Sequence, residues 1–257
     1  MTTTQQLPLA WITGGASGIG LSTARALGRQ GFKVAISGRS VEKVNTAVAT
    51  LQADGLTAIG LPLDVGDGPA VEQAGAGLIA EHGPVSVLVA AAGTNVPKRY
   101  WRDLKAADFA SVNATNLNGV VNTICAVLPG MREQGQGTVI VISSWAGWRF
   151  LPFTGAAYGA TKQALAPVVE SLNDQEGPNG IRATVVCPGE VATPILRSRP
   201  SPPPEADIAQ MLIPEDVADA IAYVVAAPGR VCINELVISP TVNRIYTGAP
   251  DLTGNRG

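Results

Sequence analysis

The chain has 257 residues, of which 46% are hydrophobic and 15% charged, and its net charge is −2 at pH 7. This length suits one large domain or two small ones, and the near-neutral charge without a basic cluster argues against nucleic-acid binding. The longest apolar run, residues 85–92, is too short to span a bilayer, and the first residues lack the features of a signal peptide, so we expect a cytoplasmic protein with no membrane partner.

The cysteine and histidine content argues against a metal centre. Cys125, Cys187 and Cys232 are widely spaced among apolar neighbours, so we expect three buried, inert thiols. The only histidine, His82, lies in a helix-ending Glu-His-Gly-Pro turn. Neither a Ser-His-Asp hydrolase nor a His-ligated metal site is therefore supported, and we expect no metal.

The N-terminal part of the chain has the layout of a nucleotide-binding loop. A short apolar strand at residues 9–12 leads directly into TGGASGIG at residues 13–20, and a helical pattern then continues to residue 30. Glycines permit a tight turn and a close backbone approach, and the following helix N-terminus offers free amides and a positive dipole to a pyrophosphate. The spacing is Gly-x-x-x-Gly-x-Gly rather than the commoner Gly-x-Gly-x-x-Gly.

Strands and helices alternate along the rest of the chain. We expect further strands at residues 33–37, 58–63, 85–92, 139–142, 183–187 and 236–238, and helices at residues 41–53, 69–81, 108–131, 156–169 and from residue 214. This alternation indicates βαβ units around a parallel sheet, and the nearly continuous apolar strands indicate a sheet covered on both faces. The sequence therefore predicts an α/β fold, and no linker or internal repeat divides the chain.

The sequence YGATK at residues 158–162 suggests acid–base chemistry. Side chains four residues apart share one face of a helix, so we expect the Tyr158 hydroxyl and the Lys162 ammonium to lie together. A free phenol titrates near ~10, and a nearby ammonium favours the phenolate and lowers its pKa toward neutrality. Taken alone, such a pair also occurs on the surface of ordinary helices.

Three loop segments are the expected walls of a substrate pocket: residues 94–101, 145–153 and 195–211. The second contains Trp145, Trp148, Phe150 and Phe153. These aromatic side chains favour either an apolar or ring-bearing substrate or a role in packing or a subunit interface. The proline-rich stretch at residues 197–205 is either a lid or a surface loop.

Seven short motifs give the chain its resemblance to the short-chain dehydrogenase/reductase family. In the family's order they are TGGASGIG at 13–20, DV at 64–65, AAAG at 90–93, NLNG at 116–119, ISS at 142–144, YGATK at 158–162 and PGEVAT at 188–193. The resemblance implies a single Rossmann-like, doubly wound domain with a seven-stranded parallel sheet flanked by helices. We expect this domain at residues 1–245, followed by a tail at 246–257 that is either flexible or at a subunit interface. Residues 233–241 are similar to the branch of NADP-dependent hydroxy-acid dehydrogenases and clavulanate-pathway reductases.

The resemblance implies a catalytic set of Asn116, Ser144, Tyr158 and Lys162. Tyr158 would exchange a proton with the substrate oxygen, and Ser144 would hydrogen-bond that oxygen. Lys162 would lower the pKa of Tyr158 and hold the nicotinamide ribose, and Asn116 would hold a water that relays protons from Lys162. Because neighbouring strand residues face opposite sides, only one of Ser143 and Ser144 should face the site, and we choose Ser144.

The end of the second strand indicates the cofactor. In such a fold this position lies beside the adenosine ribose, where an acidic residue binds the 2′-hydroxyl of NAD. Here Gly38 leaves space for a 2′-phosphate and Arg39 offers donors suited to it, so we expect NADP(H), with NAD(H) as the second possibility. The expected cofactor-binding residues are Gly14, Ser17, Gly18, Ile19, Arg39, Asp64, Val65, Gly93, Tyr158, Lys162, Pro188, Gly189, Val191 and Thr193.

Two departures from the family pattern affect the expectations. Ala90 and Ala91 replace a common Asn pair, which predicts some lost rigidity but not lost activity. Pro167 lies within the helix that carries Tyr158, which predicts a local kink and casts doubt on the usual tetramer geometry.

We expect an oxidoreductase that transfers a hydride between NADP(H) and a secondary alcohol or ketone, as a homodimer or homotetramer. The alternatives are a nicotinamide-dependent epimerase or dehydratase, and a non-catalytic NADP-binding redox sensor.

Overall fold

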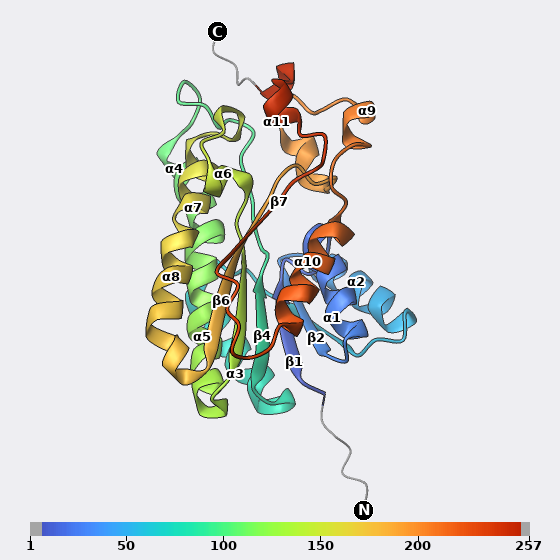
Figure 1. The fold of residues 1–257 in the computed structure, drawn as a ribbon, viewed down its shortest axis with the longest axis vertical. Helices are drawn as coiled ribbons and strands as arrows, with labels where there is room; N and C mark the ends of the chain where they lie inside the picture. The colour runs from blue at the N-terminus through green and yellow to red at the C-terminus, as the bar shows by residue number, and fades with distance from the viewer. Residues whose placement is uncertain (1–6, 253–257) are drawn as a thin grey trace, which may run out of the picture.

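The computed structural model describes residues 7–252, apart from the side chains of Arg197, Ser198 and Pro250. Its middle layer is one parallel sheet in the order β3-β2-β1-β4-β5-β6-β7 (Figure 1). The strands are β1 (Leu9–Thr13), β2 (Lys33–Gly38), β3 (Ala58–Pro62), β4 (Val85–Ala90), β5 (Gly137–Ile142), β6 (Ile181–Pro188) and β7 (Glu235–Ile238). The predicted α/β fold with a seven-stranded parallel sheet is confirmed.

Helices connect the strands and cover the sheet. The α-helices are α1 (Gly18–Arg29), α2 (Val41–Ala53), α3 (Gly68–His82), α4 (Ala106–Asn113), α5 (Gly119–Gln134), α6 (Trp145–Trp148), α7 (Ala156–Gln163), α8 (Leu165–Glu176), α9 (Glu205–Ile208), α10 (Pro214–Ala226) and α11 (Arg244–Thr247). Short 3-10 helices are η2 (Pro152–Thr154), η3 (Gly177–Asn179), η4 (Pro194–Ser198) and η5 (Pro250–Leu252), and η1 (Ala114–Asn118) is a π-helix. Within residues 7–252, no helix has the length and apolar character needed to cross a membrane.

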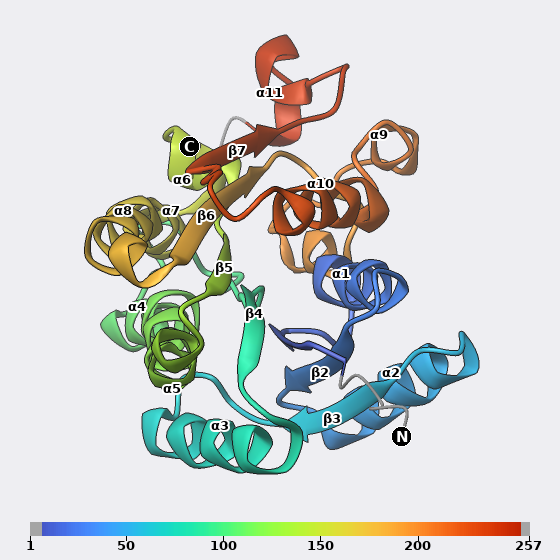
Figure 2. The ribbon, with the colours of Figure 1, turned by 60° about the horizontal axis from the view of Figure 1, so that its bottom comes forward.

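The two faces of the sheet carry separate hydrophobic cores. Figure 2 shows α1, α2 and α10 on one face and α3, α5 and α8 on the other. Ala10 and Ile12 of β1 belong to the core beneath the first group, whereas Leu9 and Trp11 belong to the core beneath the second. Every residue of β1 is therefore buried, as the continuous apolar sequence predicted.

The strand order places a ligand-binding crevice at the centre of the sheet. β1 pairs with β2 on one side and with β4 on the other, so the connections leave the sheet in opposite directions at this point. In open α/β sheets such a switch point, at the carboxyl ends of the strands, is where ligands bind. The loops after β1, β4, β5 and β6 all begin at this edge.

The predicted helical region at 108–131 is confirmed, because residues 106–134 are helical throughout, but it contains a π-helical turn. α4 and α5 are separated by the π-helix η1, which contains Asn116. The helix that carries Tyr158 is also interrupted: α7 ends at Gln163 and α8 begins at Leu165, after Ala164. Pro167 explains this break, since it has no N–H to donate to the carbonyl of Gln163.

The prediction of three buried cysteines is wrong for two of them. Cys187 is buried in the core, but Cys125 and Cys232 are exposed. The apolar neighbours of Cys125 in sequence belong to a helix whose other face is buried, so local composition did not reveal which side the thiol faces.

Candidate active site

A cavity with a volume of about 290 Å³ lies at the carboxyl edge of the sheet. Its lining brings together most of the residues predicted from sequence: Gly14, Ser17, Gly18, Ile19, Gly93, Ser144, Tyr158, Lys162, Pro188, Gly189, Val191 and Thr193. Four predicted residues, Arg39, Asp64, Val65 and Asn116, do not line it. The glycine loop lines this cavity together with Ser144, which follows β5, and with Tyr158 and Lys162 of α7.

The loop after β1 is shaped to hold an anion against backbone amides. Gly14 has a φ of 64°, and a Cβ there would lie 2.9 Å from the Ala91 carbonyl oxygen, so only glycine fits. Ser17 is the N-cap of α1, but its side chain caps no amide. The first N–H groups of a twelve-residue helix are thus left for a ligand, and the helix dipole favours a negative one.

Tyr158 and Ser144 meet at the end of β5. Ser144 is the N-cap of α6, where its Oγ accepts a hydrogen bond from Ala146 N at 3.1 Å, and it lines the same cavity as Tyr158. The neighbouring Ser143 donates its Oγ–H to the Lys162 carbonyl at 2.8 Å. Ser143 therefore ties α7 to the sheet, while Ser144 is the serine beside Tyr158.

Burial raises the pKa of Tyr158 above its usual value, although the hydrogen bond with Ser144 and the charges of Arg199 and Arg99 oppose this shift. The direction contradicts the expectation that the nearby Lys162 brings the pKa of this phenol down. The physical reason is that desolvation disfavours the phenolate more than the neighbouring groups favour it. In this structure Tyr158 is therefore a protonated donor at neutral pH.

Lys162 is buried, with only 4% of its surface exposed. Its Nζ donates to the Ile142 carbonyl at 2.6 Å and lies 5.9 Å from the centroid of the Tyr158 ring. Burial lowers the pKa of Lys162 to about 8. The ammonium can therefore lose or regain a proton close to neutral pH, which suits a residue in a proton-transfer path.

Asn116 lies behind the cavity wall rather than in it. Its Nδ2 donates to the Thr94 carbonyl at 3.0 Å, and its Oδ1 accepts from Thr94 N at 2.8 Å. A Cβ at Gly93 would lie 3.6 Å from Lys162 Nζ and 3.8 Å from Asn116 Oδ1, so Gly93 lies close to both side chains. Asn116 thus fixes the turn after β4, and its role in a water relay stays a prediction.

The three remaining residues lie where the adenosine end of a dinucleotide was expected. Arg39 is exposed directly after β2. Asp64 is exposed, with its Oδ1 accepting from Gly66 N at 2.9 Å, and Val65 is buried. The structure therefore leaves the Arg39 side chain open to solvent at the carboxyl edge of β2.

Sequence reasoning missed three charged residues in the cavity wall: Arg99, Glu190 and Arg199. Arg99 is buried and donates from Nε to the Val96 carbonyl at 2.9 Å. Arg199 donates from Nη1 to Glu190 Oε1 at 2.7 Å, and its Cζ lies 5.0 Å from the centroid of the Phe153 ring. Glu190 falls within the PGEVAT motif, and Arg99 and Arg199 fall within the expected pocket walls at 94–101 and 195–211, so their positions were the available signal.

The aromatic loop divides between the cavity and the surface. Trp145 and Phe153 are buried and line the cavity. Trp148 stacks on Trp145 with ring centroids 5.7 Å apart, and Phe150 is 78% exposed. The loop therefore places two aromatic side chains in the cavity wall and one on the surface, and its role toward a substrate or a partner subunit stays a prediction.

Among the described residues there is no group of three or more His, Cys, Asp and Glu side chains that could hold a metal ion.

A model of the family described as short chain dehydrogenase matches residues 8–203. The chain belongs to the short chain dehydrogenase family. One relative of this short chain dehydrogenase, the uncharacterized oxidoreductase SH0585 of Staphylococcus haemolyticus, is 32% identical over 234 residues, which are 90% of this chain and 96% of the relative. As a family member the chain is an oxidoreductase.

Two further likenesses differ in extent. The glycine betaine reductase ATRR of Emericella nidulans is 33% identical over 237 residues. The matched stretch covers 90% of this chain but only 18% of ATRR, which is a much longer protein. A solved structure of a singly substituted actinorhodin polyketide ketoreductase with NADPH is also similar. It superposes with a TM-score of 0.83 at 30% sequence identity, and the match covers 93% of this chain and 97% of the ketoreductase.

Proposed function

We propose that this short chain dehydrogenase transfers a hydride between NADP(H) and a secondary alcohol or its ketone, with Tyr158 as the general acid and base. The observation that carries the proposal is the position of Tyr158. Tyr158 and Ser144 line the same cavity as the uncapped N-terminus of α1. An anion site and a proton donor thus share one cavity of the size of a small ligand site.

The residues present fit a nicotinamide dinucleotide phosphate. The glycine loop and the first amides of α1 would hold the pyrophosphate, and Arg39 with the small Gly38 would accept the 2′-phosphate. The likeness to a ketoreductase solved with NADPH supports the same choice. When bound, NADPH supplies the hydride that reaches the carbonyl carbon of the substrate.

Each side chain then has a separate task in reduction. Ser144 and Tyr158 hydrogen-bond the carbonyl oxygen, which polarises the carbonyl and positions its carbon. Tyr158 donates its proton to the oxygen as the C–O double bond becomes a single bond, so that a ketone, a hydride and a proton give a secondary alcohol. Its raised pKa suits this direction, because the phenol is fully protonated before the reaction.

Lys162 would return a proton to Tyr158 and hold the nicotinamide ribose. Its pKa of about 8 allows it to release a proton near neutral pH. In oxidation, the positive charge of the oxidised nicotinamide would help Tyr158 to accept the proton of the alcohol.

The test is a panel of ketones and secondary alcohols assayed by NADPH absorbance. Consumption of one NADPH for each ketone reduced is the expected result. Conversion of a substrate with no net change in NADPH would instead indicate an epimerase or dehydratase. NADPH binding without turnover of any panel member would contradict the proposal and favour a redox sensor.

A further inference from the structure

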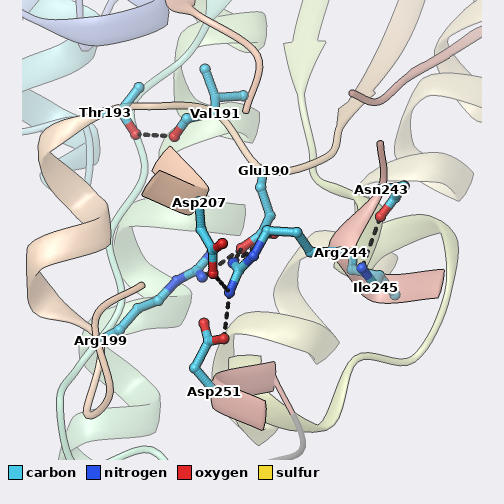
Figure 3. A network of polar contacts seen from close by, with 9 residues as sticks. All are labelled: Glu190, Val191, Thr193, Arg199, Asp207, Asn243, Arg244, Ile245 and Asp251. Carbon is cyan, nitrogen blue, oxygen red and sulfur yellow. Dashed lines mark hydrogen bonds and ion pairs between the residues drawn. The ribbon is translucent and has the colours of Figure 1, made fainter. Parts of the chain in front are cut away.

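A cluster of buried and partly buried charges joins the end of β6 and the loop that follows it to the C-terminal part of the described chain. We call it the Arg244 cluster, and its members are Glu190, Arg199, Asp207, Arg244 and Asp251 (Figure 3). The Nη1 atom of Arg244 donates to both carboxylate oxygens of Glu190 at 3.1 Å, and its Nη2 lies 2.9 Å from Asp207 Oδ2 and also contacts Asp251 Oδ1. One guanidinium therefore bridges three carboxylates, and Glu190 binds Arg199 as well.

Each carboxylate comes from a different part of the chain around the cavity. Glu190 follows β6, whose end forms the cavity wall. Asp207 lies in α9, within the lid segment, which we define as residues 194–212. Asp251 lies in η5, within the C-terminal segment, residues 243–252, and this segment also supplies Arg244. Figure 1 shows α9 and α11 near each other, beyond the carboxyl ends of the strands.

The C-terminal segment is also part of the substrate side of the cavity. Ile245 lines the cavity, and Leu252 is buried in a small apolar core with Trp145 and Phe153. Tyr158 is packed against the same core. A shift of this segment would therefore move the wall that faces the proposed proton donor. Of the expected tail at 246–257, the structure describes residues 246–252, and residues 253–257 lie outside the described part.

The energetics of the Arg244 cluster favour a positioning role over simple stabilisation. Glu190 and Arg244 are each 6% exposed, and Arg244 Nε and Asp251 Oδ2 are buried with no hydrogen-bond partner in residues 7–252. Buried ion pairs with incomplete hydrogen bonding contribute little net stability, because desolvation offsets the attraction. Removal of Arg244, however, would leave Asp207 and Asp251 without the cation that pairs them with Glu190, which keeps only Arg199, and the repulsion among these carboxylates would push the segments apart.

We propose that Arg244 is a positioning residue that fastens the C-terminal segment and the lid segment together as the outer wall of the substrate pocket. This role rests on the proposed function of the cavity. Through Glu190, the same cluster fixes Arg199, which lines the cavity and packs on Phe153. The nucleotide end of the cavity, formed by the glycine loop and α1, makes no contact with Arg244 in the interactions described above.

The test compares Arg244→Met, which removes the charge, with Arg244→Lys, which keeps it without the planar fork. The matched control is Arg132→Met, because Arg132 also pairs with a buried carboxylate, Glu176, but joins α5 to α8 and does not line the cavity. We expect Arg244→Met to raise the KM for a ketone substrate at least tenfold, with the Kd for NADPH within about threefold of the wild-type value. Arg244→Lys should recover part of this loss, and Arg132→Met should leave KM unchanged.

Hydrogen exchange supplies a readout that needs no substrate and tolerates a weakened fold. In Arg244→Lys, amides of the lid segment and of the C-terminal segment should exchange faster together, while those of α1 stay as in the wild type. Unchanged exchange in both segments, or equal KM effects of Arg244→Met and Arg132→Met, would overturn the inference. If no ketone is turned over by the wild-type enzyme, the proposed function fails, and the exchange experiment alone decides the role of Arg244.

Discussion

Replacing Lys162 with Met should remove a pH dependence from the stability of the protein. Burial lowers the pKa of Lys162 to about 8 in the folded chain, against 10.5 for a lysine exposed to water. Between these two values the unfolded chain binds more protons than the folded chain, so the free energy of unfolding rises with pH. Below pH 8 both states are mostly protonated, and the folded state carries the full cost of a buried ammonium.

The size of the effect follows from the two pKa values. The Lys162 contribution to the free energy of unfolding becomes more favourable by roughly 1.3 kcal/mol between pH 7 and pH 9. The variant also loses the hydrogen bond from Nζ to the Ile142 carbonyl, which leaves a buried acceptor unpaired at a cost of about 1–3 kcal/mol. That cost does not vary with pH. It therefore adds the same amount to the difference in free energy of unfolding between wild type and variant at pH 7 and at pH 9, and does not alter how this difference changes with pH.

The measurement is urea unfolding of the wild type and of Lys162→Met without cofactor, at pH 7 and pH 9 and at one protein concentration. The wild type should gain about 1 kcal/mol relative to the variant at the higher pH. Other titrating groups are common to both proteins and cancel in this difference. A stability difference that is equal at the two pH values, or that shifts in favour of the variant at pH 9, would refute the assignment of a buried, charged lysine. The variant should also lose both turnover and NADPH affinity, because Lys162 is assigned two roles, and a loss of turnover alone would contradict the ribose contact.

Three further predictions concern catalysis, cofactor choice and assembly. Tyr158→Phe should lower kcat by ~10²–10⁴ with NADPH affinity within a few-fold, and near-normal turnover on a verified substrate would contradict the acid–base assignment. The double variant Gly38→Asp, Arg39→Ile should reverse a roughly ten- to hundred-fold preference for NADPH over NADH in kcat/KM. An added Cβ at Gly38 would meet only Val44 Cγ2 at 3.5 Å and Ala16 Cβ at 3.7 Å, so the change should not disturb the fold. Equal kcat/KM for both cofactors in the unmutated enzyme would contradict the role of Arg39 in binding the 2′-phosphate. Sedimentation should show dimers or tetramers at micromolar concentration, because so few charged residues suggest a surface that associates, and a monomer alone would contradict this.

The fold could be predicted from sequence because its signals are local. Each strand is a short apolar run between turn residues, and the strand boundaries seen in the structure differ from the expected ones by at most two residues. The glycine loop and YGATK likewise carry their chemistry within a few consecutive residues. Once the strand order is known, the ends of β1, β4, β5 and β6 bring these motifs together without further information.

The parts of the site that could not be predicted depend on contacts between distant segments. The pairing of Arg244 with Glu190 spans 54 residues, and no periodic pattern marks either partner. The direction of the Tyr158 pKa shift depends on its burial, which sequence spacing does not report. The choice of Ser144 over Ser143 rested on strand alternation, whereas the contact that separates them, from the Ser143 hydroxyl to the Lys162 carbonyl, joins segments 19 residues apart.

The π-helix η1 has a consequence for how this chain tolerates changes in length. A π turn accommodates an extra residue compared with an α-helical turn, and each residue of an α-helix rotates the next side chain by about 100°. The extra residue therefore sets the rotational phase between α4 and α5, so that Val112 and Val120 are both buried while Asn116 reaches Thr94. Deleting one residue within 114–118 would allow a regular helix, yet it would turn either Asn116 or the buried face of a neighbouring helix away from its partners. The number of residues in this turn therefore determines whether Asn116 can reach Thr94.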